Sequence, residues 1–216
     1  MASTTEDSIP ASDTTPSAVT IALPTTPIIT TPTLLIRPYH ASDAPAIARE
    51  ANDPLIARYM RNRFPHPYGL ADAEAWLATA AAAAEGPDVS FAVCHAPSGR
   101  YAGGIGLRPF ADVEARTMEI GYWLGREHWG RGLATEAVRA FGRWAFAAYP
   151  ELRRLEAGVF AGNDASARVL AKAGYVLEGR RRDACWKNGA FLDIAMYSLL
   201  REECLGAEEA EETATA

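Results

Sequence analysis

Two glycines, Gly130 and Gly132, carry the clearest chemical signal in this sequence. They stand between an alternating apolar segment, Met118–Leu124, and a segment with apolar residues at helical spacing, Leu133–Ala148. A glycine lets the backbone turn sharply and lets a ligand approach it closely. A helix that begins at such a turn presents unpaired N–H groups and the positive end of its dipole, which suit a phosphate group. The spacing therefore predicts an anion cradle made of a strand, a glycine turn and a helix.

Two common nucleotide-binding motifs do not fit this turn. A P-loop requires a lysine directly after its second glycine, and neither glycine here is followed by one. A dinucleotide-binding fingerprint requires a third glycine, where this chain has Thr135, and an acid after the next strand, where it has Ala161-Gly-Asn163. A glycine turn that merely links a strand to a core helix remains an alternative at this point.

The glycine turn and a segment downstream of it each resemble a motif of one protein family. The segment Glu127-His-Trp-Gly-Arg-Gly132 resembles the central Q/R-x-x-G-x-G/A motif of the GCN5-related N-acetyltransferases, the GNAT superfamily, with Glu127 in place of Gln or Arg. That departure resembles the ribosomal-protein alanine N-acetyltransferase branch (RimJ/RimL type). The segment Asn163–Gly179 is similar to a second motif of this branch, N-x-x-S-x-x-V-L-x-K-x-G-F. With matching flanks, the resemblance covers roughly Thr33 to Arg201.

The resemblance implies the GNAT fold, a mixed α/β structure with a twisted, six- to seven-stranded mixed sheet flanked by about four helices. The alternation of strand-like and helix-like segments agrees with this, and it predicts helices on both faces of the sheet. Besides the two motifs, the expected elements are a helix at Asp72–Glu85, a hairpin of Val89–Cys94 and Tyr101–Leu107, and a final hairpin of Asp183–Trp186 and Phe191–Leu199 that turns at Asn188-Gly189.

Composition divides the chain into three parts. Residues 1–32 are rich in Thr, Ser and Pro and are expected to be a disordered leader. Residues 33–201 are the expected N-acetyltransferase domain, and residues 202–216 an acidic disordered tail. The net charge of −6 arises from the ends, because the domain itself holds 21 basic and 18 acidic residues. This small excess does not favour nucleic-acid binding.

The resemblance implies an acetyl-CoA-dependent N-acetyltransferase that moves an acetyl group to a primary amine by direct attack in a ternary complex. The acceptor is either a protein N-terminus or a small-molecule amine, and the sequence leaves both open. A non-catalytic acetyl-CoA-binding regulatory module is the alternative. Unperturbed amines have pKa values near 10, or about 8 for an α-amino group, so they are protonated at neutral pH and catalysis requires a base.

Two residues are expected to serve the proton transfers. Glu119 lies on the strand face opposite Ile120 and Tyr122, and the resembled branch has a glutamate proposed as general base there; the alternative is a carboxylate that orients substrate or pairs with an arginine. Many superfamily members have a tyrosine that protonates the departing thiolate seven residues after the motif asparagine. That position is Leu170 here, which excludes a tyrosine acid at this place. Ser166 is the resembled branch's candidate partner for the departing thiolate, and its alternative is a residue that satisfies backbone groups in the helix's first turn.

The resemblance also implies two sets of ligand contacts. The expected acetyl-CoA contacts are Tyr122, Trp123 and Leu124 along the pantetheine arm, Gly130, Arg131, Gly132, Leu133, Ala134 and Thr135 around the pyrophosphate, and Arg126, Asn163, Ser166 and Lys172 beside them. The expected acceptor contacts are the aromatic residues Phe64, His66, Tyr68 and Trp186, for which core or loop packing is the alternative.

The remaining expectations are absences. Cys94, Cys185 and Cys204 are widely spaced and have no histidine at ligand spacing, so neither a metal site nor a disulfide framework is indicated. No histidine accompanies Cys185, which disfavours an acyl-cysteine route. We expect a monomer or weak homodimer in the cytoplasm, free to diffuse into the nucleus, without nucleic-acid or membrane partners.

Overall fold

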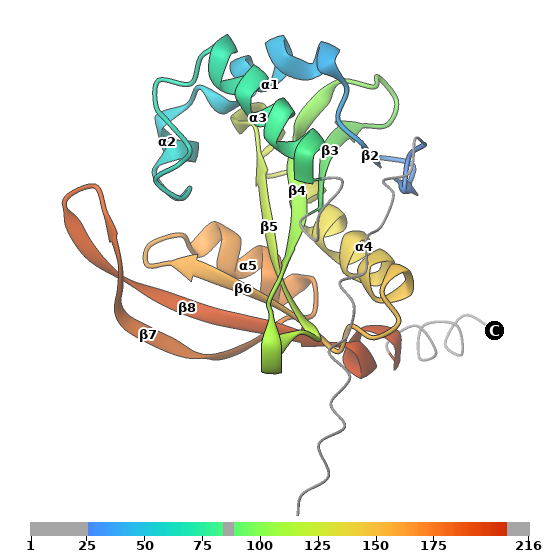
Figure 1. Ribbon diagram of the computed structural model, residues 1–216, viewed down its shortest axis with the longest axis vertical. Helices are drawn as coiled ribbons and strands as arrows, with labels where there is room; N and C mark the ends of the chain where they lie inside the picture. The colour runs from blue at the N-terminus through green and yellow to red at the C-terminus, as the bar shows by residue number, and fades with distance from the viewer. Residues whose placement is uncertain (1–25, 84–88, 207–216) are drawn as a thin grey trace, which may run out of the picture.

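An eight-stranded mixed sheet runs through the molecule in the computed structural model, which describes residues 26–83 and 89–206 (Figure 1). In chain order the strands are β1 (Ile29–Thr30), β2 (Leu34–Arg37), β3 (Val89–His95), β4 (Tyr101–Pro109), β5 (Thr117–Leu124), β6 (Arg154–Phe160), β7 (Val176–Lys187) and β8 (Ala190–Leu200). Their order in the sheet is β1-β2-β3-β4-β5-β6-β8-β7. Only β5 and β6 pair in parallel among these neighbours. The predicted fold class is confirmed, with one strand more than the upper expectation.

Helices cover both faces of the sheet, because apolar side chains alternate between the two faces along its strands. On β3, Phe91 and Val93 face one core cluster and Ala92 and Cys94 face the other. The first cluster contains residues of α4 (Leu133–Ala148) and α5 (Asp164–Lys172), and the second contains residues of α1 (Ala44–Ala51) and α3 (Leu70–Ala83). A four-residue helix, α2 (Pro54–Ala57), follows α1 after Asn52 and Asp53.

The long helix α4 is fixed by its apolar stripe. Leu133, Ala137, Phe141 and Ala145 recur at helical spacing and are all at least nine-tenths buried against the sheet. The helix ends at Ala148, two residues before Pro150, which cannot continue a helix. Because this stripe seats the helix firmly on the sheet, the position of the glycine turn at its N-terminus is also fixed.

The described structure extends beyond the predicted domain boundaries. Ile29 and Thr30 pair with Ile36 and Leu35 of β2, although the sequence placed them in a disordered leader. At the other end, residues 201–206 are helical and Cys204 is buried in the core cluster, although the sequence predicted a disordered tail from residue 202. Ile28 and Ile29 at one end and Cys204 at the other pack into the same core cluster, which accounts for the differences. The other residues of the predicted leader and tail, 1–25 and 207–216, lie outside the described residues.

A buried ion pair fixes the link between β2 and α1. Arg37 donates two hydrogen bonds of 2.8 Å to the Asp43 carboxylate, and the His40 amide donates a third of 2.8 Å. Burial acts to raise the pKa of the Asp43 carboxyl, but these hydrogen bonds outweigh it and hold the pKa below its usual value. Asp43 therefore stabilises the fold at neutral pH.

Asp43→Asn is expected to lower the free energy of unfolding by about 2–3 kcal/mol at pH 7, because it leaves the Arg37 guanidinium, whose side chain is only 14% exposed, without its charged partner. The native pKa is depressed, so this stabilisation is present above the usual carboxyl pKa near 4 and is lost as pH falls below it. Urea unfolding at several pH values should show wild type and variant converging below about pH 4.

Glu151→Gln is the matched control, since Glu151 forms an ion pair with Arg116 in which both side chains are more than two-thirds exposed. We expect a change within about 0.5 kcal/mol at every pH. Equal losses for the two variants at pH 7 would contradict the importance assigned to burial of the Arg37–Asp43 pair.

Candidate active site

The glycine turn has the backbone that the sequence predicted. Gly130 and Gly132 have φ angles of 73° and 79°, in the left-handed region that favours glycine. A Cβ atom built on either residue would meet no heavy atom within 4 Å, so the space beside the turn is open. Gly132 is the N-cap of α4, and the first N–H groups of the helix have no partner within it. The turn therefore fits a pyrophosphate group.

The sheet opens directly beside this turn. Strands β5 and β6 pair only from Thr117 to Glu119, opposite Arg154 to Glu156. Beyond that point β5 continues along β4 as far as Leu124, while β6 continues along β8 as far as Phe160 (Figure 1). The two strands diverge, and within the described part of the chain the edge of β5 that faces β6 has no strand partner from Ile120 onward. This edge includes the backbone of the predicted contacts Tyr122, Trp123 and Leu124.

Glu119 lies at the point where the strands separate. Its carboxylate is contacted by Arg61 on one oxygen and by Arg108 on the other. Arg108 is its register partner on β4, and Glu156 is its register partner on β6. The arginine pairing considered in the sequence analysis is therefore present. Each carboxylate oxygen has two lone-pair sites, so this pairing leaves room for a water molecule.

Tyr122 and Ser166 meet on the other face of the sheet. The Tyr122 hydroxyl lies 2.8 Å from the Ser166 hydroxyl and joins β5 to α5. Burial raises the pKa of Tyr122 to about 12, although the Ser166 hydrogen bond acts in the opposite direction. Tyr122 is therefore protonated at neutral pH. The Asn163 side chain accepts a 3.2 Å hydrogen bond from the Ser166 amide, so Asn163 caps α5.

The strand alternation places the two predicted catalytic side chains on opposite faces. Met118, Ile120 and Leu124 belong to the core beneath α4 and α5, and Tyr122 packs against it. Glu119 therefore lies opposite Ile120 and Tyr122, as predicted, on the face covered by α1 and α3. Ser166 lies on the other face, which α5 covers. Because the sheet is open between β5 and β6, groups on the two faces border the same opening.

The predicted acceptor residues divide into packed and exposed ones. Tyr68 is 6% exposed, its ring centroid lies 4.8 Å from that of Phe64, and Phe64 in turn packs at 5.7 Å against Trp123. His66 is exposed, and Trp186 is 55% exposed. The Asn62 side chain donates a 3.3 Å hydrogen bond to the Trp186 carbonyl. The loop of residues 61–68 and the β7–β8 hairpin therefore meet, as the predicted pocket requires.

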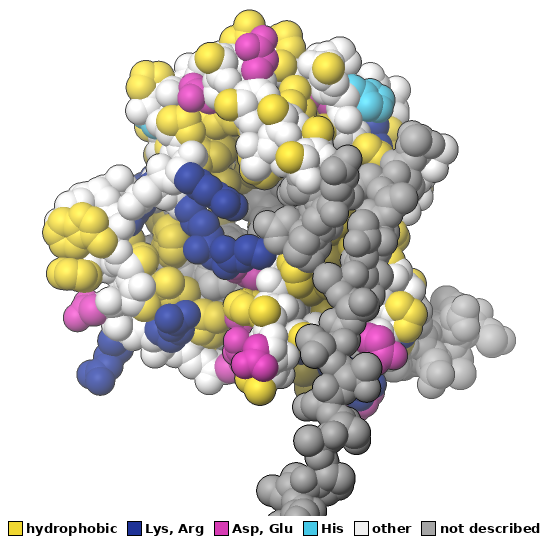
Figure 2. Space-filling model, in the orientation of Figure 1, with side chains coloured by type: hydrophobic (Ala, Val, Ile, Leu, Met, Phe, Trp, Pro, Cys, Tyr) yellow, Lys and Arg dark blue, Asp and Glu magenta, His cyan; other side chains and the backbone are white. Residues whose placement is uncertain are grey.

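Lys and Arg side chains gather over a hollow between the part of the molecule that carries α1 to α3 and the part formed by β7 and β8 (Figure 2). Among the predicted cofactor contacts, Arg126 pairs with Asp53 at 3.7 Å, and Arg131 and Leu133 line a cavity of about 220 Å³ at the start of α4. Lys172 is exposed at the end of α5, where its carbonyl accepts a hydrogen bond from Arg139. The structure records no shared contact between Lys172 and the glycine turn among the described residues.

The pattern of residues did not identify which arginines pair with Glu119. Arg108 could have been identified from the sequence, because the side-chain alternation of β4 and β5 determines which residues stand opposite one another. Arg61 could not be identified in this way, since it lies in a loop with no periodic pattern.

No helix among residues 26–83 and 89–206 is long and apolar enough to cross a membrane.

The sheet that opens between two parallel strands and the glycine turn at the head of α4 are the features of an acetyltransferase with the GNAT fold. Residues 33–176 match the acetyltransferase (GNAT) domain family, and the chain belongs to this family. It is an N-acetyltransferase, an enzyme that transfers an acetyl group to an amine, as the sequence predicted.

Individual relatives agree with this assignment. The uncharacterized N-acetyltransferase p20 of Bacillus licheniformis is 31% identical over 173 residues, covering 80% of this chain and 96% of its own. The ribosomal-protein-serine acetyltransferase of Escherichia coli is 34% identical over 96 residues, covering 44% and 53%. The solved structure of Mycobacterium smegmatis RimJ in complex with CoA-disulfide superposes with a TM-score of 0.71 at 24% identity, covering 79% and 83%.

Proposed function

We propose that this enzyme binds acetyl-CoA in the opening between β5 and β6 and transfers the acetyl group directly to a primary amine in a ternary complex. The divergence of the two strands after Glu119 carries the proposal, because it leaves a free strand edge that leads to the glycine turn. Backbone groups of Tyr122 to Leu124 pair with the pantetheine arm. The turn from Gly130 to Thr135 holds the pyrophosphate.

Acetyl-CoA supplies an activated acetyl thioester. The acceptor amine must lose a proton, and Glu119 accepts it through a water molecule, since both carboxylate oxygens already contact arginines. Arg61 and Arg108 hold the carboxylate at the mouth of the opening. Positioning of the amine beside the thioester supplies much of the remaining rate enhancement, because no covalent intermediate with the protein is needed.

The hydroxyl groups of Tyr122 and Ser166 stabilise the departing thiolate. Their 2.8 Å separation leaves one hydroxyl free to donate outward, and Tyr122 keeps its proton at neutral pH. Ser166 acts by hydrogen bonding rather than as a strong acid, and solvent supplies the proton. Asn163 orients this pair by capping α5 at the Ser166 amide.

The acceptor is a peptide N-terminus or a small-molecule amine that enters from the Glu119 face. Similarity to the ribosomal-protein-serine acetyltransferase of Escherichia coli supports a protein acceptor. The meeting of residues 61–68 with the Trp186 hairpin supports an acceptor pocket at the same mouth. We expect the enzyme to act as a monomer or weak homodimer in the cytoplasm.

An acceptor screen tests the proposal. Acetyl-CoA is incubated with N-terminal peptides, polyamines, aminoglycosides or amino acids, and thiol release is compared with acetylated product by mass spectrometry. We expect equal amounts of thiol and acetylated amine for at least one class. Binding of acetyl-CoA with no turnover on any amine would instead support the non-catalytic binding module.

Ser166→Ala is expected to lower kcat roughly 10- to 100-fold, because a hydrogen bond to a charged group is worth about 1.5–3 kcal/mol. The dissociation constant for acetyl-CoA should stay within about threefold, since the phosphate contacts are elsewhere. Ser198→Ala is the control, because the Ser198 hydroxyl bonds Glu178 instead. Unchanged kcat in Ser166→Ala would remove this residue from the mechanism.

A further inference from the structure

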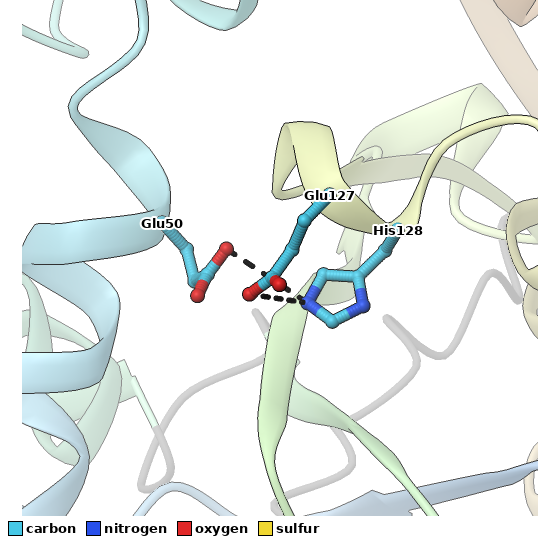
Figure 3. Close-up of side chains that lie close together, drawn as sticks. All are labelled: Glu50, Glu127 and His128. Atoms are coloured by element: carbon cyan, nitrogen blue, oxygen red, sulfur yellow. Dashed lines mark ion pairs between the residues drawn. The ribbon is translucent and has the colours of Figure 1, made fainter.

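A cluster of three potential metal ligands lies between α1 and the loop that leads into the glycine turn (Figure 3). Glu50 comes from α1, and Glu127 and His128 come from the 3-10 helix Arg126–His128 after β5. His128 Nε2 lies 3.8 Å from Glu50 Oε2 and 3.7 Å from Glu127 Oε1. The three ligand atoms all lie within 4.8 Å of one another. Such spacing suits the coordination of a single ion.

The histidine in this cluster is buried, and its Nε2 atom lies too far from either carboxylate for a hydrogen bond. His128 is 8% exposed, and its Nε2 atom makes no hydrogen bond to any residue in the ranges 26–83 and 89–206. Burial lowers the pKa of His128, although Glu50 and Glu127 act to raise it. The neutral imidazole is the form that ligates metals. Leaving a buried polar atom unpaired is unfavourable, and an ion between the three side chains would satisfy it.

The surroundings orient the carboxylates without filling the space between them. Arg49 contacts Glu50 Oε1 at 2.9 Å, which leaves Oε2 directed towards His128. Arg100 contacts Glu127 Oε1 at 2.7 Å, and that carboxylate keeps further lone pairs for a ligand bond. A Cβ atom on Gly125 would lie 2.2 Å from Glu50 Oε2, so the glycine backbone presses directly against this oxygen.

We propose that Glu50, Glu127 and His128 bind a divalent transition-metal ion of the zinc type. One imidazole nitrogen with two carboxylate oxygens suits Zn²⁺ or Mn²⁺ better than Mg²⁺, which prefers oxygen ligands alone. Bonds of about 2.0–2.2 Å place neighbouring ligand atoms about 3.3 Å apart in tetrahedral geometry, so small side-chain movements close the site. Arg49, Arg100 and the nearby Arg131 oppose the cation, which favours an ion with strong imidazole affinity.

The site joins two elements that the sequence holds far apart. Glu50 lies on α1, and the other two ligands lie directly before the turn at Gly130. A bound ion therefore locks the loop to α1, and we expect it to raise the melting temperature of the protein.

Calorimetric titration of the metal-stripped full chain with ZnCl₂, MnCl₂ and MgCl₂, in separate experiments without CoA, tests the proposal. We expect one equivalent of Zn²⁺ or Mn²⁺ to bind and raise the melting temperature, with much weaker Mg²⁺ binding. His128→Gln and Glu127→Gln should weaken binding at least about tenfold. Glu127 is exposed, so its variant keeps the fold even if the buried histidine does not tolerate substitution.

His95→Gln is the matched control, because His95 lines the same cavity as His128 but lies outside the cluster. It should bind the ion as wild type does. No binding of Zn²⁺ or Mn²⁺ to the wild type, or equal binding by Glu127→Gln, would overturn the proposal. Neither result depends on acetyl transfer, so the metal site and the proposed function are tested separately.

Discussion

Glu119→Gln is expected to lower kcat by about 10²- to 10⁴-fold, the usual contribution of a general base. The variant keeps the shape of the side chain and one acceptor oxygen for an arginine, but its NH2 group cannot accept from the second arginine, and an amide cannot accept the amine's proton. The dissociation constant for acetyl-CoA should stay within about threefold, because the phosphate and pantetheine contacts lie elsewhere on the loop and strand. Steady-state kinetics and calorimetry measure the two effects independently.

Glu156→Gln provides a matched control for this result. Glu156 stands opposite Glu119 in the neighbouring strand and is likewise held by an arginine, Arg154, at 3.2 Å. It should keep wild-type kcat within about threefold, since it has no assigned part in proton transfer. If both variants lose activity equally, the effect comes from the charge of the strand pair. If Glu119→Gln retains full turnover, another group is the base.

Gly132→Ala is expected to raise the dissociation constant for acetyl-CoA at least about 100-fold. An alanine at φ 79° is strained by roughly 1–2 kcal/mol, and relief of the strain moves the first amides of α4. Its methyl group also enters the open space beside the turn. Loss of two charge-assisted hydrogen bonds, each worth about 1.5–3 kcal/mol, accounts for the size of the effect.

Gly189→Ala separates backbone strain from loss of the cradle. Gly189 has a φ of 80° and equally open surroundings, but it lies in the β7–β8 turn. Both variants should lose a similar amount of thermal stability, whereas only Gly132→Ala should lose affinity for acetyl-CoA. Equal affinity losses would show that the effect reports general destabilisation and that the phosphate lies elsewhere.

Local patterns predicted most of the fold because they depend on neighbouring residues. The alternation from Met118 to Leu124 predicted β5, and the helical spacing from Leu133 predicted α4. Asn188 and Gly189 both have positive φ, as a two-residue hairpin turn requires. The start of β7 was missed, because this edge strand is exposed on both sides from Val176 and shows no alternation of burial.

The site was predicted as far as its motifs extend. The glycine turn and the facing of Glu119 follow from conformation and period, and the structure has both. The contact of Arg61 with Glu119 spans 58 residues and depends on how a loop returns to the sheet. The same holds for Glu50 and His128, which meet only when α1 packs beside the loop after β5. Local sequence patterns do not predict contacts between side chains that are this far apart in the chain.

Both edges of the sheet are protected against pairing with another chain. One edge strand, β1, has only two residues, too few to serve as a template. The other, β7, carries three consecutive arginines at 180–182, and its register with β8 shifts between Arg181 and Cys185. Charge repulsion and the irregular backbone both oppose edge-to-edge aggregation. The hairpin therefore reaches the loop of residues 61–68 without presenting a regular strand edge to a neighbouring chain.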